Sequence, residues 1–431
     1  MSKIVGLVGA MMLILVGCSQ SESEGQSATD LSSGQLYTTE TSRVDPAELE
    51  RLVSLGYVDY ATGTVEPARD SKYNRIAGDY IFYVSADSPS AQLALPNGEV
   101  LHTWQIPFDQ IWPDGPNWQD EFSASLMPGT SHQGYWRRAY LQSDGSVLLI
   151  FENLGLARID RDSKVIWKSR LRAHNDLELD EHGRSWVLTR KPRKISGLER
   201  TFEVMDNLIT VLSPQGELID ETSLIDVLDG SILTRRDWRA WIDDPQDRPT
   251  DPLHANSIEL IPENLTARSS LGGANVLVSI RNLNRVVAVD TDRGRVTFVG
   301  RGDFRAQHDV TLTADGTILL FDNLGAKTWS RVFEFELAPW NLIWSYTGES
   351  GSRFFSTFQS TASRLSDGTT LIVPSATGSA FIVTPEGEIA WRFSNPHRAR
   401  SKKNRTASLW DLKVVSASEL NREFRISIGA E

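Results

Sequence analysis

In the stretch from Phe304 to Asn323, a short polar group, Gln307 to Asp309, stands near the start of a segment rich in strand-forming residues, Ala306 to Thr313, and an apolar run, Thr317 to Phe321, follows. Asp315-Gly316 in its middle is typical of a tight hairpin turn, so the stretch predicts two antiparallel strands. A histidine at the start of such a strand can donate a proton, accept one or attack an electrophile. We therefore predict that His308 is a nucleophile and that its partners come from other parts of the chain.

Two more histidines, His174 and His254, stand near the corresponding position of other strand pairs. Counted back from the glycine of its own turn, His174 lies one residue further away than His308 does from its turn glycine. Asn175 is therefore the alternative candidate for the position that corresponds to His308. The matching residue of a further strand pair is Arg137. If these strands surround one axis, the side chains converge at one mouth of a central channel.

A second polar position lies at the end of the second strand of each pair. In four of the pairs this position holds a charged residue: Glu152, Arg190, Arg281 and Asp322. Arg281 directly follows an apolar run, which is an unusual place for a guanidinium unless it turns into a cavity. Arginines together with histidines predict an anion site, because the guanidinium fork matches oxyanions. A zinc site built from the three histidines is the alternative, but the arginine and the lack of a carboxylate at that position favour the anion.

The elements that must position these residues come from a weak repeat that begins at Gly78. Six units share two apolar runs joined by a turn, followed by two outer strands: 78–107, 139–171, 174–224, 254–302, 306–348 and 361–396. Four strands in each of six units predict an all-β, six-bladed propeller over residues 78–420. The first unit lacks its inner strand, and Ser408 to Ala417 is expected to supply it and to close the ring.

The N-terminal part predicts export. Residues 1–17 carry one charge and an apolar run that is short for a membrane span, which is typical of a signal peptide. The run ends at Cys18, the single cysteine of the chain, in a pattern that resembles a bacterial lipobox. We expect Cys18 to be lipidated, residues 18–44 to be a flexible tether, and residues 45–77 to be a short helical segment. The expected location is the cell envelope, on an outer-membrane anchor facing the periplasm.

Composition narrows the possible partners. The 431 residues carry 44 basic and 56 acidic side chains, a formal net charge of −12. Nucleic-acid binding usually requires a basic face, so this balance argues against a nucleic-acid partner. A single cysteine also rules out a disulfide framework and a cysteine-based metal site within the chain.

Several of these motifs together resemble one family, the bacterial arylsulfotransferases. The similar segments are AHNDLELD at His174, HANSIEL at His254, VSIR ending at Arg281, QHD at His308 and the closing TPEGEIAWRFSNP. The resemblance covers roughly Gly134 to Pro396. It implies a six-bladed propeller that moves a sulfuryl group from an aryl sulfate to a phenol, without a cofactor, through a sulfated histidine.

By the same resemblance, His308 is the nucleophile, with His254, Arg281 and His174 beside the sulfuryl group. Arg137, Asn175 and Asn256 are expected to contact the substrate. This chain departs from its relatives at Asn175, where many have a second histidine, and at Phe358, near which relatives tend to have a histidine. Two other classes stay open: a non-catalytic, envelope-anchored binding propeller, and a quinone-dependent dehydrogenase propeller. The sequence leaves the oligomeric state undetermined.

Overall fold

The computed structural model describes residues 76, 78–115, 130–196, 201–243, 251–266, 271–326, 328–349, 353–400 and 405–430. All of them belong to one compact unit, Thr39–Glu431. The predicted signal peptide, the lipidated tether and, apart from Ile76, the predicted helical segment 45–77 lie outside the described residues. Within the described residues, no helix has the length and apolar character needed to cross a membrane.

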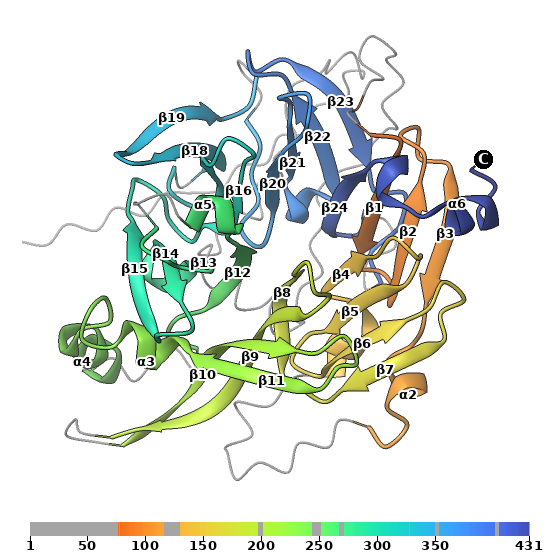
Figure 1. Ribbon diagram of the computed structural model, residues 1–431. Helices are drawn as coiled ribbons and strands as arrows, with labels where there is room; N and C mark the ends of the chain where they lie inside the picture. Colours follow the sequence, from red (N-terminus) through yellow and green to blue (C-terminus); the bar gives the residue numbers. More distant parts are fainter. Residues whose placement is uncertain are drawn as a thin grey trace, which may run out of the picture. The chain divides into compact units, whose positions relative to one another are not determined.

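The described residues form six antiparallel four-stranded sheets arranged as the blades of a propeller, which confirms the predicted fold (Figure 1). The strands of the first three blades, from the inner strand outward, are β24 (Leu409–Val415), β1 (Tyr80–Ser85), β2 (Ser90–Ala94), β3 (Val100–Gln105); β4 (Arg138–Leu141), β5 (Val147–Phe151), β6 (Gly155–Ile159), β7 (Val165–Ser169); and β8 (Ala173–Leu179), β9 (Ser185–Ile195), β10 (Phe202–Leu212), β11 (Leu218–Ser223). Those of the next three are β12 (Ala255–Leu260), β13 (Val276–Ile280), β14 (Arg285–Asp290), β15 (Arg295–Gly300); β16 (His308–Leu312), β17 (Ile318–Asp322), β18 (Arg331–Leu337), β19 (Trp340–Tyr346); and β20 (Thr361–Arg364), β21 (Thr370–Val373), β22 (Ser379–Val383), β23 (Ile389–Ser394).

Short helices connect or flank the blades. They are α2 (Phe108–Ile111), η4 (Thr130–Gly134), α3 (Leu224–Leu228), α4 (Arg235–Asp243), α5 (Glu263–Thr266), η5 (Arg281–Leu283), η6 (Ser375–Thr377), η7 (Ala417–Glu419) and α6 (Arg422–Ser427). Of these, η5 matters most for the site, because it begins at Arg281, where β13 ends.

Packing between neighbouring blades makes the core. Successive side chains of a strand point to opposite faces, so Ile318 and Leu320 of β17 join one buried cluster while Leu319 and Phe321 join another. In the described part of the chain there is one such apolar cluster at each of the six blade interfaces. This burial on both faces explains why the middle strands are continuous apolar runs.

The ring is closed by the C-terminal strand. The strand predicted between Ser408 and Ala417 is present as β24, which pairs antiparallel with β1 from Tyr80↔Val415 to Ser85↔Leu409. The predicted turn at Asp315-Gly316 is also present: Gly316 has a φ of 81° and its N–H donates to Thr313 O. A positive φ of this kind favours glycine.

Four inner strands, β8, β12, β16 and β24, are irregular at the end where the candidate residues lie. The pairing register shifts between Ala173 and Leu177 in β8, and between His308 and Thr311 in β16, with a similar shift at the start of β12. Asn175 and Asp309 adopt positive φ angles of 54° and 52° at these points. Bulges re-aim side chains, and Asn and Asp tolerate the left-handed region better than most residues. The bulges therefore decide which side chains face the axis.

Candidate active site

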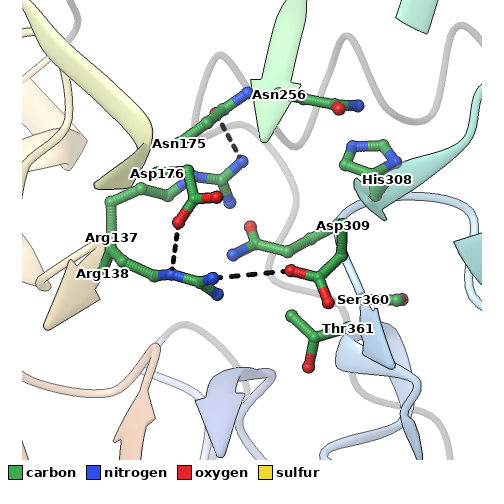
Figure 2. Close-up of a pocket in the computed structure, with 10 residues that line it drawn as sticks. Arg137, Arg138, Asn175, Asp176, Asn256, His308, Asp309, Ser360 and Thr361 are labelled. Carbon is green, nitrogen blue, oxygen red and sulfur yellow. Dashed lines mark hydrogen bonds and ion pairs between the residues drawn. The ribbon is translucent and has the colours of Figure 1, made fainter. Parts of the chain in front are cut away.

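Side-chain hydrogen bonds between blades define the equivalent positions of the inner strands. The side-chain oxygens of Asp176, Ser257 and Asp309 each accept a hydrogen bond from a backbone N–H of the next blade, at 2.9–3.0 Å. The residue that precedes each of them holds the same position at one mouth of the channel. With the corresponding residues of the other blades, this ring consists of Arg137, Asn175, Asn256, His308, Ser360 and Trp410. The first five of these border one pocket, and Figure 2 shows their side chains around it.

His308 is buried and its ring is held in one orientation. Its Nδ1 lies 2.8 Å from Asn323 Oδ1 and 3.1 Å from the carbonyl oxygen of Ala306. The amide group of Asn323 donates to the carbonyls of Ser356 and Gln359, both at 2.9 Å, so its oxygen is the atom that faces the histidine. Both neighbours of Nδ1 are therefore acceptors, so Nδ1 carries the proton and the lone pair lies on Nε2.

The surroundings of His308 also keep it neutral. Burial lowers its pKa well below the ordinary histidine value, and the charges of Arg281, His254 and Arg137 lower it further. Burial and the neighbouring Arg305 lower the pKa of Arg281 to about 10, so the guanidinium remains charged at neutral pH. A neutral imidazole with a fixed tautomer next to guanidinium groups is suited to attack an anionic electrophile.

Arg137 and Asn175 form one unit at the mouth. The guanidinium of Arg137 donates to Asn175 Oδ1 at 2.8 Å, lies 3.4 Å from Glu152, and stacks over the ring of Trp410 at 4.9 Å. The amide of Asn175 donates to Ala255 O in the next blade. Asn175 is thus the strict equivalent of His308, as the turn spacing indicated, and both ends of its amide group are engaged in holding the arginine and the neighbouring strand.

His254 is oriented by Asp251, a residue that the sequence analysis did not single out. Its Nδ1 lies 3.1 Å from the carboxylate of Asp251, which also lies 2.8 Å from the guanidinium of Arg190. Burial by itself raises the pKa of Asp251, but Arg190 and His254 outweigh it and hold this pKa well below its usual range. The backbone N–H of Arg281 donates to His254 O, which joins these two predicted residues directly.

His174 and Asp322 take other places than the mouth of the pocket. His174 is fully buried, its Nε2 lies 3.3 Å from Thr189 O, and burial lowers its pKa well below the ordinary value. The charges of Arg190 and His254 lower this pKa further and the charge of Asp251 opposes them, so His174 lies close to the pair of His254 and Asp251. Asp322 pairs with Arg331 at 2.6 Å, within its own blade.

The pocket itself is narrow. Its volume is about 10 Å³, which is close to the space that one water molecule requires. A planar ring cannot enter such a space, whereas the oxygens of a tetrahedral anion can contact its rim. Asn256 contributes a donor to Gln307 O, while its Oδ1 is buried without a hydrogen-bond partner. Among the described residues, no group of three His, Cys, Asp or Glu side chains is arranged to hold a metal ion.

Taken together, the fold and the site define a six-bladed propeller with a narrow polar pocket, bordered by His308, Arg137 and Arg138, at one mouth of its channel. The chain belongs to the arylsulfotransferase (ASST) family, whose model matches residues 138–396. This membership supports a sulfotransferase-like enzyme. A search of curated proteins finds no match.

Solved structures with a similar fold are more distant. A protein of unknown function from Bacteroides caccae shares 11% identity over 77% of this chain and 97% of that chain, with a TM-score of 0.49. Virginiamycin B lyase from Staphylococcus aureus shares 14% identity over 60% of this chain and 69% of that chain, with a TM-score of 0.37. Neither likeness bears on the function of this chain.

Proposed function

We propose that this protein is an arylsulfotransferase that moves a sulfuryl group from an aryl sulfate to a phenolic acceptor through a sulfated His308. The observation that carries the proposal is the clamp on Nδ1 by Asn323 and Ala306, which leaves the lone pair on Nε2. Family membership supports the reaction class, and the neutral state of the buried imidazole supports the role of nucleophile.

In the first step, the Nε2 lone pair attacks sulfur, the bond between sulfur and the aryl oxygen breaks, and the phenolate leaves with that electron pair. Sulfuryl transfer resembles phosphoryl transfer, with charge spread over three oxygens, so catalysis consists mainly of positioning and charge stabilisation. The guanidinium groups of Arg137 and Arg281 supply the positive charge. The imidazole becomes positive as the N–S bond forms, and the acceptors at Nδ1 then hold a charged donor.

The pair of Asp251 and His254 supplies a proton when the leaving phenol needs one. With Nδ1 held by the carboxylate, Nε2 of His254 is the nitrogen that gives the proton to the leaving oxygen and takes one from the acceptor. In the second step, the acceptor oxygen attacks sulfur, the N–S bond breaks, and neutral His308 returns. The first phenol leaves before the second attacks, so the kinetics are ping-pong. No cofactor enters either step.

The test is the intact mass of the domain from about Ser42 onward, after brief exposure to 4-nitrophenyl sulfate without an acceptor. We expect the gain of one sulfuryl group, its loss on addition of phenol, and no gain in His308→Gln. A protein that gains no mass from a panel of aryl sulfates and releases no phenol would refute the transferase. If it still bound such sulfates, the alternative of a non-catalytic, envelope-anchored binding propeller would replace it.

We further propose that the protein is an envelope lipoprotein anchored through Cys18 and facing the periplasm. The support is the lone cysteine directly after a short apolar run at the N-terminus. Growth with an alkyne-labelled palmitate should label the full-length chain and should not label Cys18→Ser. Equal labelling of both, or labelling of neither, would contradict the anchor.

A further inference from the structure

We propose that Arg138 is the positioning residue of this site. Its guanidinium lies one layer below the ring of side chains that includes Arg137, Asn175 and His308. It ties together three other blades and thereby holds His308 in its attacking position. The expected effect on turnover rests on the proposed function. The expected effect on the position of His308 rests on geometry alone. In the sequence, Arg138 is the second of two adjacent arginines, after Arg137, and no local pattern sets it apart.

Arg138 reaches across the axis from the second blade. Its Nε lies 2.8 Å from Asp176 in β8, its Nη1 lies 3.2 Å from Asp411 in β24, and its Nη2 lies 3.5 Å from Asp309 in β16. The side chain is 7% exposed, and Figure 2 shows it crossing between Asp176 and Asp309. Four of the six inner strands are thus connected through one guanidinium.

The same carboxylates also accept hydrogen bonds from the two remaining blades. The second oxygen of Asp176 accepts from the backbone N–H of Ile258 in β12, at 3.0 Å. The second oxygen of Asp309 accepts from the N–H of Ala362 in β20, at 2.9 Å. With these two hydrogen bonds, every inner strand is tied to Arg138 directly or through one carboxylate.

The link to the nucleophile is covalent and short. Asp309 directly follows His308 and adopts a φ of 52°, which an L-residue keeps only when its surroundings hold it there. Its two oxygens are held by Arg138 and by Ala362, so they fix the backbone at the bulge from which the imidazole projects. Asn175, which holds Arg137, is followed in the same way by Asp176 and has a φ of 54°.

Charge explains why an arginine stands here. Three buried carboxylates meet one cation, and two neighbouring glutamates, Glu178 and Glu259, face Lys413 one layer further along the axis. Burial by itself lowers the pKa of Arg138, but its three aspartate partners raise it overall, so the guanidinium stays charged. A planar fork with five donors can reach three carboxylates at once, whereas the compact ammonium of lysine cannot.

The experiment compares Arg138→Lys with Arg158→Lys in the full-length protein. Arg158 lies in β6 of the same blade and pairs with Asp144 away from the axis, so it is a matched control. Two readouts are taken: turnover of 4-nitrophenyl sulfate with phenol, and the NMR signals of ¹⁵N-labelled imidazoles, with the His308 signal assigned by His308→Gln. For Arg138→Lys we expect kcat to fall about 10- to 100-fold with KM changed less than about threefold, because a small misplacement costs rate rather than affinity. We also expect the His308 signal to move, and neither change in Arg158→Lys.

Unchanged kcat together with an unchanged His308 signal would overturn the inference, as would equal effects of both substitutions. If the wild-type protein turned over no aryl sulfate, the proposed function would fail, and the His308 signal alone would decide the role of Arg138. If Arg138→Lys failed to fold, Asp411→Asn would take its place. This substitution removes one partner of Arg138 from a blade that does not carry His308. A shift of the His308 signal in Asp411→Asn would support the inference, and an unmoved signal would overturn it.

Discussion

Replacing Asn323 by alanine tests the central claim about the nucleophile. The substitution removes the stronger of the two acceptors at His308 Nδ1, the one at 2.8 Å, and leaves Ala306 O at 3.1 Å. In the resting protein this is a hydrogen bond between neutral groups, with a net value of about 1 kcal/mol. In the transition state the ring becomes positive, and a hydrogen bond to a charged group contributes about 1.5–3 kcal/mol.

Only the difference between the two states slows the reaction. That difference is about 0.5–2 kcal/mol, so we expect the rate of His308 sulfation in Asn323→Ala to fall about 2- to 30-fold. The rate is measured by rapid quenching of one turnover with 4-nitrophenyl sulfate, followed by intact mass. The remaining acceptor at Ala306 keeps the tautomer, and for this reason the loss stays well short of that expected for His308→Gln.

The control is Asn395→Ala. Asn395 is also buried, and its amide donates to Ser85 Oγ at 2.8 Å and to Ala407 O at 2.9 Å, away from the site. Each substitution removes the hydrogen bonds that a buried amide donates to buried oxygens of other segments, and should lower the unfolding free energy by about 1–3 kcal/mol. Only Asn323→Ala should slow sulfation of the folded protein. Sulfation at the wild-type rate in Asn323→Ala, or an equal slowing in both variants, would refute the argument that Asn323 stabilises the positive imidazole in the transition state.

Three further outcomes are expected. Asp251→Asn should slow the sulfation of His308 by phenyl sulfate about tenfold but its sulfation by 4-nitrophenyl sulfate less than about twofold, because only the poorer leaving group needs the proton that His254 holds; equal slowing would contradict this role. His174 is buried with a lowered pKa, so the unfolded chain binds its proton more readily and stability falls as pH drops below about 6.5. Between pH 7 and pH 5 the wild-type protein should therefore lose up to about 2 kcal/mol of unfolding free energy relative to His174→Gln, measured by urea denaturation; parallel curves would show that His174 takes up no proton on unfolding. Ending the chain after Ala407 removes β24 and should leave no folded propeller by circular dichroism, since β1 would lose its inner partner; a folded product would mean that closure by β24 is dispensable.

The architecture follows from local patterns. Propeller blades are built from short segments, and the signals for them are local. These signals are apolar runs separated by turns, turn glycines such as Gly316, and the spacing of the six units. The closing strand could be predicted for the same reason, because the first unit visibly lacked one strand. The proposed nucleophile, His308, could also be singled out, since a polar group at the start of a strand is a local anomaly.

The fine geometry of the site depends on contacts that no local pattern contains. A bulge shifts every later side chain by one position, so only the structure shows that Asn175, and not His174, shares the position of His308. Asn323 ends the stretch from Phe304 that the sequence singled out, but its role depends on carbonyls 33 and 36 residues away.

Asp251 and Arg138 show the same limit. Each lies in a segment without a distinctive pattern, and each acquires its role from side chains of other blades, such as Arg190 for Asp251 and Asp309 for Arg138. The sequence by itself determined the blades, their closure and the histidine that we propose as the nucleophile. The tertiary structure decided which groups hold that residue neutral, oriented and in place, because burial and charge act between residues that are distant along the chain.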